Sequence, residues 1–203
     1  MQPMSRVKAA TLHLGVSAVI VSAVVASLYL IWYPPPLFQT SGLDRFLIIL
    51  VGVDLTIGPL LTLIVFRAGK PGLKLDLTLI GLAQVAALAY GLYVMWQARP
   101  VYMVAAVDRI ELVNANEIDE QYLEEAKDTP YASLPPFGAE LVALAIPTDT
   151  ELRNRLMDEV LSGKPDLPLR PRYYAPYESA SQQLSAKGHA ATGLFVVYPE
   201  LRD

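Results

Sequence analysis

Residues Arg45–Phe66 read RFLIILVGVDLTIGPLLTLIVF, an apolar stretch with no polar helical face. About 20 apolar residues is the length that a helix needs to cross the hydrocarbon core of a bilayer. One acid, Asp54, lies inside the stretch, and Gly58 and Pro59 follow it within a turn and a half of helix. Such a pair weakens a helix in water, but in membranes neighbouring helices re-satisfy the freed carbonyl groups. The stretch therefore predicts a transmembrane helix that carries an ionisable group.

Two further apolar runs flank this stretch, at about residues 11–33 and 73–96. Arg6 and Lys8 precede the first run as in a signal peptide, but the run is too long for one and ends at prolines instead of a cleavage site. We interpret it as a retained helix. The sequence thus predicts a membrane domain at residues 1–97, with helices at about residues 11–33, 45–66 and 73–96.

The ends of the predicted helices carry residues typical of membrane–water interfaces. Aromatic residues that we expect there are Tyr29, Trp32 and Tyr33 on the first helix and Tyr90, Tyr93 and Trp96 on the third. We expect His13 to lie at the level of the lipid headgroups. Three consecutive prolines at residues 34–36 predict a stiff, extended loop before the second helix.

Charge divides the chain into two halves. Residues 1–97 hold six basic and three acidic side chains, and residues 98–203 hold ten and seventeen, so the halves carry +3 and −7 and sum to −4. The second half has the balance of a water-exposed acidic domain. The absence of cysteine excludes disulfides, thiol catalysis and Cys-ligated zinc. No basic stripe is present, so we expect no nucleic-acid partner.

The short loops predict the orientation in the membrane. Five basic residues lie before the first helix or between the second and third, namely Arg6, Lys8, Arg67, Lys70 and Lys74. The other short loop carries only Arg45, beside Asp44. The positive-inside rule then places the N-terminus in the cytoplasm and residues 98–203 outside. In a bacterium with two membranes, this predicts an inner-membrane protein with a periplasmic C-terminal domain.

The second half predicts a small α+β domain. We expect strands at residues 101–107, 110–113, 140–146 and 193–198. We expect helices at residues 118–127, 150–162 and 179–186, the first of them capped by Asn116. The proline- and tyrosine-rich residues 164–178 are expected to be irregular. The fold class is therefore a membrane protein with three transmembrane α-helices followed by a small α+β extracytoplasmic domain.

Nothing in the second half predicts catalysis. His189 is its only histidine, no GxSxG motif surrounds a serine, and no histidine pair has the spacing of metal ligands. A carboxylate pair among the scattered acids stays open. We expect no enzyme activity, no catalytic or metal-ligating residues and no cofactor.

The candidate site in the membrane is Asp54 with Gly58, Pro59 and Gln84. Asp54 and Gly58 share one helix face, and Pro59 removes the donor for the carbonyl of Leu55. An acid inside a membrane needs a partner or a purpose. The partner is either internal, with Gln84 or Thr56 as candidates, or a helix of a client protein; the alternative purpose is an ion or proton relay.

The candidate interface in the second half is Arg170, Arg172, Tyr173, Tyr174 and Tyr177. Tyrosine and arginine are the residue types that dominate the energetics of protein interfaces. The alternative is a loop that packs on its own domain with the tyrosine rings buried.

These segments together resemble the type IV pilin accessory family of the TfpX/TfpZ type. The resemblance rests on HLGVSAVIVSAVV leading into WYPPPLF, then LVGVDLTIGPLLTLIVF, KPGLKLDL, QVAALAYGLYVMWQARPVY, GKPDLP and YYAPYE, in this order over roughly the first 180 residues. It implies an inner-membrane protein without enzymatic activity that assists pilin stability, pilus assembly or surface display. Members often run on past the YYAPYE segment, so we expect an abbreviated exported domain here.

Two functions therefore compete. In the first, the three helices, rich in Gly and Ala, dock the apolar N-terminal helix of a type IV pilin, which the resemblance implies bears one intramembrane Glu. The alternative is a small membrane sensor or transporter component built around Asp54. The partners expected are pilin, other pilus assembly proteins and the lipid bilayer, with the oligomeric state left open.

Overall fold

The computed structural model describes residues 4–35, 37–106 and 109–179. The chain divides into two compact units, Met1–Arg99 and Pro100–Asp203. We call the first the helical unit and the second the sheet domain, and describe each by itself.

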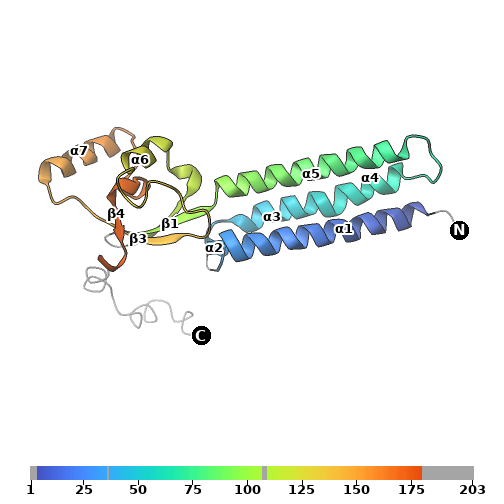
Figure 1. Cartoon of the computed structure of the whole chain (residues 1–203), viewed down its shortest axis with the longest axis horizontal. Helices are drawn as coiled ribbons and strands as arrows, with labels where there is room; N and C mark the ends of the chain where they lie inside the picture. Colours follow the sequence, from blue (N-terminus) through green and yellow to red (C-terminus); the bar gives the residue numbers. More distant parts are fainter. Residues whose placement is uncertain (1–3, 36, 107–108, 180–203) are drawn as a thin grey trace, which may run out of the picture. The chain divides into compact units, whose positions relative to one another are not determined.

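The helical unit consists of three long helices that run side by side (Figure 1). Their segments are α1 (Arg6–Ser27) with the π-helical turn η1 (Leu28–Trp32), then α3 (Leu43–Gly52), the π-helical turn η2 (Val53–Ile57) and α4 (Gly58–Val65), and finally α5 (Leu73–Gln97). All three are long and apolar enough to cross a membrane. The expected fold of three membrane-capable helices is therefore confirmed.

The first helix begins earlier than its apolar run predicts, at Arg6 instead of about residue 11. The hydroxyl of Ser5 accepts a hydrogen bond from the amide of Lys8 at 3.2 Å and caps the helix. Because a capped helix tolerates charged residues in its first turns, Arg6 and Lys8 extend it beyond the apolar run.

The loop after the first helix differs from the expected extended segment. It contains a short helix, α2 (Leu37–Thr40), which starts where the amide of Leu37 donates to the carbonyl of Pro34 at 2.8 Å. Tyr33 does not face the membrane interface: its ring is buried, and its hydroxyl donates to the carbonyl of Met95 at 3.0 Å. A tyrosine can bury its ring only if its hydroxyl finds an acceptor, and the end of α5 supplies one.

The sheet domain contains a four-stranded mixed sheet of order β2-β1-β3-β4. Its strands are β1 (Pro100–Ala105), β2 (Ile110–Asn114), β3 (Glu140–Leu144) and β4 (Tyr174–Pro176). The first two form an antiparallel hairpin, β3 lies parallel to β1, and β4 lies antiparallel to β3. The small domain of strands and helices is confirmed as predicted.

Two of its helices connect the strands. Helix α6 (Glu120–Glu125) follows a 3₁₀ turn, η3 (Ala115–Glu117), and the capping box there uses Asn114 with Glu117. The N-cap of α6 is Asp119, so the predicted cap at Asn116 is wrong. Helix α7 (Thr150–Leu161) is capped by Asp149, whose carboxylate accepts from the amide of Leu152 at 2.7 Å.

The segment expected to be irregular holds the fourth strand. After two 3₁₀ turns, η4 (Leu167–Leu169) and η5 (Pro171–Tyr173), the backbone of β4 pairs with β3. Proline is tolerated there because an edge strand leaves one row of its amides unused. The helix expected at residues 179–186, apart from Ser179, and the strand expected at residues 193–198 lie outside the described residues.

The core of the sheet domain is apolar and aromatic. Its buried members are Val101, Tyr102, Val104, Val113, Ala115, Ile118, Tyr122, Val142 and Tyr174. The rings of Tyr102 and Tyr174 meet edge to face with their centroids 4.9 Å apart. Burial raises the pKa of both phenols above the ordinary value of 10.0, so both stay neutral at physiological pH.

Candidate functional site

Asp54 lies in the π-helical turn η2, at the middle of the second span. Pro59 follows this turn within a continuous helical backbone, so its missing N–H leaves a carbonyl of the preceding turn without an intrahelical donor. A π-helical turn changes which way the preceding side chains point, and such turns are frequent at functional sites. Asp54 is 5% exposed, and its Oδ1 atom has no hydrogen-bond partner among the described residues.

Gln84 of α5 packs against this turn. Its Nε2 donates to the backbone carbonyl of Asp54 at 3.2 Å. A Cβ atom on Gly58 would overlap the amide of Gln84, so any other residue there would displace this amide from its present position. The structure thus brings together Asp54, Gly58, Pro59 and Gln84, and the amide of Gln84 donates to the main-chain carbonyl of Asp54.

His13 of α1 joins the same site. Its Nδ1 lies 2.6 Å from the hydroxyl oxygen of Thr62, and its Nε2 lies 2.7 Å from Oε1 of Gln84. Because an amide oxygen only accepts, Nε2 carries a proton, and in the neutral ring Nδ1 accepts from the hydroxyl of Thr62. The ring of His13 lies between the helices, where two polar groups satisfy it, and its position at the level of the headgroups stays a prediction.

Sequence reasoning missed His13 and Thr62 as members of the site. We call His13, Asp54, Thr62 and Gln84 the polar cluster. A signal for Thr62 was available, because Asp54, Gly58 and Thr62 follow one another at four-residue spacing and so share one helix face. No comparable spacing links His13 to the other helices.

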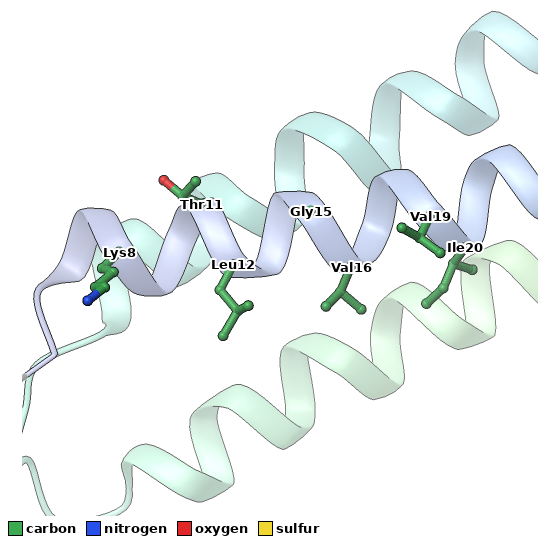
Figure 2. A pocket seen from close by; sticks show the side chains of 7 residues that line it. All are labelled: Lys8, Thr11, Leu12, Gly15, Val16, Val19 and Ile20. Atoms are coloured by element: carbon green, nitrogen blue, oxygen red, sulfur yellow. The ribbon is translucent and has the colours of Figure 1, made fainter.

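An apolar groove opens beside the polar cluster. A cavity of ≈ 170 Å³ lies between α1 and α5, and Asp54 forms part of its wall together with His13 and Gln84. A second, open hollow of ≈ 590 Å³ follows the surface of α1 from Lys8 to Ile20, and all of its lining residues belong to α1. Figure 2 shows Leu12 and Val16 of this cavity projecting from α1.

The two cavities are continuous along α1. Val16 and Ile20 line both of them, and we call the combined hollow the α1–α5 groove. Neither Gly15 nor Gly81, one on each side, has an atom within 4 Å of the position that a Cβ would take. Open space at small residues lets another helix approach closely inside a membrane. The groove is therefore the part of the helical unit where another helix would approach Asp54.

The five interface candidates of the sheet domain do not form one exposed surface. Arg170 and Tyr174 are buried, with 3% and 6% of their surface exposed, whereas Arg172 is exposed and Tyr173 and Tyr177 are half-buried. The hydroxyl of Tyr174 donates to the carbonyl of Pro168. Arg170 and Tyr174 therefore hold the domain together, and Arg172 and Tyr173 remain available to a ligand. The described residues contain no group of three or more His, Cys, Asp or Glu side chains placed to hold a metal ion.

Comparisons with known proteins indicate the family. The family model of the fimbrial assembly protein FimB matches residues 2–42. The chain is 30% identical to the fimbrial assembly protein of serogroup E1 from Dichelobacter nodosus over 184 residues. This match covers 87% of this chain and 69% of that relative. It is 31% identical over 114 residues to the protein of serogroups C1 and C2 from the same organism, covering 55% of this chain and 86% of the relative. No solved structure matches.

These matches confirm the resemblance to a type IV pilus assembly family. The long match to the serogroup E1 protein covers both the helical unit and most of the sheet domain, so the similarity is not limited to apolar composition. This chain belongs to the fimbrial assembly protein family.

Proposed function

We propose that this protein is an inner-membrane assembly factor for type IV pili that binds the pilin subunit and catalyses no reaction. Its similarity to fimbrial assembly proteins supports a role in building pili. Three membrane-capable helices support action within the membrane. To this role in pilus assembly we add that the protein binds pilin and acts as its chaperone.

The observation that carries pilin binding is the unpaired oxygen of Asp54. A buried polar atom without a partner is costly, and more so in a membrane, where water cannot replace the missing partner. The α1–α5 groove leads from the outer face of the helices to this carboxyl group. An apolar helix that carries one hydrogen-bond donor would fill the groove and satisfy Asp54. The N-terminal helix of a pilin has the apolar character required.

The alternative of a proton or ion relay is less well supported. A relay has to cross a hydrocarbon core of about 30 Å. Along the second span the polar cluster extends from Asp54 to Thr62, which are eight residues apart, so it covers only about 12 Å. A cluster of that size suits recognition of a single polar group better than transfer across the membrane.

Pilin capture tests the proposal. Asp54→Leu keeps the main-chain carbonyl to which Gln84 donates, so we expect normal protein abundance but at least a fivefold loss of co-purified pilin. Asp54→Asn retains an acceptor oxygen and should therefore lose less of the co-purified pilin than Asp54→Leu does. Thr78→Val is the matched control, because it removes an exposed polar group from α5 outside the groove. Undiminished capture by Asp54→Leu would contradict the proposal.

The proposed orientation has its own test. Five basic residues in the N-terminal segment and the loop between α4 and α5 support a cytoplasmic N-terminus and a periplasmic sheet domain. An alkaline phosphatase fused after Asp203 should be active, and one inserted at Gly72 should be inactive. The opposite pattern would move the sheet domain to the cytoplasm.

A further inference from the structure

A polar pocket of ≈ 470 Å³ lies in the sheet domain. Its volume falls within the range of about 300–1,000 Å³ that is typical of ligand sites. The pocket is formed by α6, α7 and the segment that leads into η5. The residues that carry its charge are Glu125, Arg155, Glu159, Lys164, Arg170 and Arg172.

The lining is positively charged within an acidic half of the chain. Four of these side chains are basic and two are acidic, a balance of +2, whereas residues 98–203 as a whole carry −7. Arg155 and Arg172 are exposed and form no ion pair with any described residue. Two basic groups are therefore available at the mouth of the pocket.

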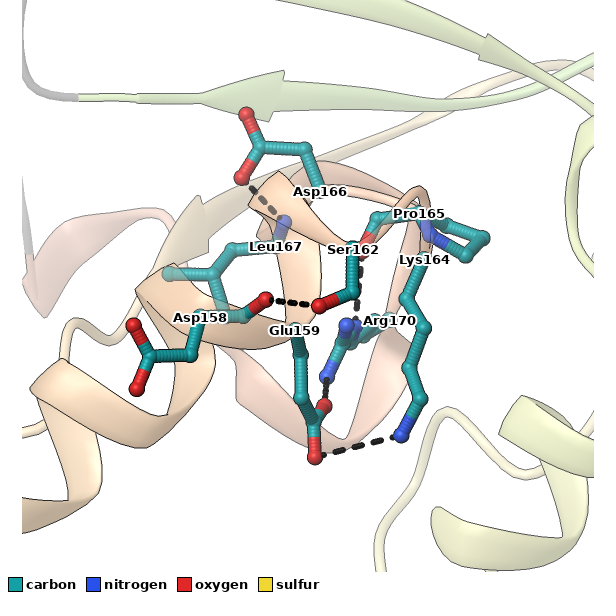
Figure 3. A network of polar contacts seen from close by, with 8 residues as sticks. All are labelled: Asp158, Glu159, Ser162, Lys164, Pro165, Asp166, Leu167 and Arg170. Atoms are coloured by element: carbon teal, nitrogen blue, oxygen red, sulfur yellow. Dashed lines mark hydrogen bonds and ion pairs between the residues drawn. The ribbon is translucent and has the colours of Figure 1, made fainter.

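The third arginine lies deeper and is held in place. Nε of Arg170 donates to the carbonyl of Pro165 at 2.9 Å, and Nη1 donates to Glu159 at 2.7 Å (Figure 3). Lys164 lies 3.3 Å from the other oxygen of Glu159. Nη2 of Arg170 is buried and has no hydrogen-bond partner among the described residues. One donor of a fixed guanidinium group is thus left without an acceptor.

We infer that this pocket binds a carboxylate group. Arginine forks match the two oxygens of a carboxylate, and Arg155 and Arg172 would neutralise its charge while Nη2 of Arg170 completes its hydrogen bonds. The balance of +2 attracts phosphate as well, so inorganic phosphate is the competing ligand in the test. This inference does not depend on pilin binding in the membrane.

The test uses the full chain in lipid nanodiscs and two blocked tripeptides, one with a central glutamate and one with a central glutamine. We expect saturable binding of the glutamate peptide by calorimetry, and at least tenfold weaker binding of the glutamine peptide. The double variant Arg155→Gln with Arg172→Gln should weaken the glutamate peptide at least tenfold. Arg170 is left intact because its removal endangers the fold.

The matched control is Lys127→Gln with Arg153→Gln, which removes two basic residues that do not line the pocket. It should bind as the wild type does. Competition by acetate at millimolar concentration would support the site and show that free carboxylates also enter, whereas its absence would favour a peptide source. Equal binding of both tripeptides, equal loss in both double variants, or binding of inorganic phosphate alone would overturn the inference.

Discussion

Asp54 of the helical unit and Arg170 of the sheet domain are both buried charged side chains, and the two units treat them differently. In the sheet domain, Arg170 is paired with Glu159 and also donates to a main-chain carbonyl. In the helical unit, Asp54 has no ion pair among the described residues, and one of its oxygens has no partner. Each side chain keeps one polar atom without a partner among the described residues, Oδ1 of Asp54 and Nη2 of Arg170, but the charge of Arg170 is balanced by Glu159. The ion pair gives Arg170 a structural role, and its absence at Asp54 supports the recognition role that we propose for the helical unit.

Removing the paired charge should have the largest effect on stability. Arg170→Ala deletes the ion pair with Glu159 and the bond to Pro165, and we expect the free energy of unfolding of the sheet domain to fall by about 3 kcal/mol. Pulse proteolysis of the full chain across a urea gradient, with cleavage mapped to residues 100–179, measures this. Arg153→Ala, an exposed arginine on the same helix as Glu159, should change it by less than about 0.5 kcal/mol. Similar losses in both variants would refute a structural role for the pair.

Disturbing the polar cluster should have an intermediate effect. Gly58→Ala forces the amide of Gln84 away from its bonds to His13 and Asp54, and we expect a cost of about 1–3 kcal/mol in thermal unfolding of the detergent-solubilised protein. The cost should largely disappear in a Gln84→Ala background, because the overlapping group is then absent. Gly52→Ala is the control, since nothing lies within 4 Å of its Cβ position. A cost that persists without Gln84 would show that the clash lies elsewhere.

The smallest expected effect is the change with pH in the stability that the Arg170–Glu159 ion pair contributes. The hydrogen bond from Arg170 holds the pKa of Glu159 below its ordinary value of 4.5. Glu159 then stabilises the sheet domain fully above pH 4.5, and this contribution is lost as the pH falls through the lowered pKa. The stability difference between the wild type and Glu159→Gln should therefore be constant from pH 7 to about 5 and shrink below that range. A difference that grows on acidification would reverse the assigned direction.

The two units also differ in how much of each site could be predicted from the sequence. In the helical unit, Asp54, Gly58, Pro59 and Gln84 were predicted as one site because an acid and a helix-breaking pair inside an apolar run conflict with its composition. In the sheet domain, β4 and the burial of Arg170 were not predicted. An isolated three-residue strand with a proline has no local pattern, and it forms only because β3 offers its edge.

By itself, the sequence determined that the chain has three membrane-capable helices and a separate polar domain, because each span is a continuous apolar run whose length reports the bilayer thickness. Composition also excluded disulfide and thiol chemistry, since the chain has no cysteine. Only the tertiary structure decided that His13 lies against Thr62 and Gln84, and that Arg170 is enclosed while Arg172 is exposed. Those outcomes depend on which faces of distant segments meet, and no local periodicity records a contact between residues 49 or 71 positions apart.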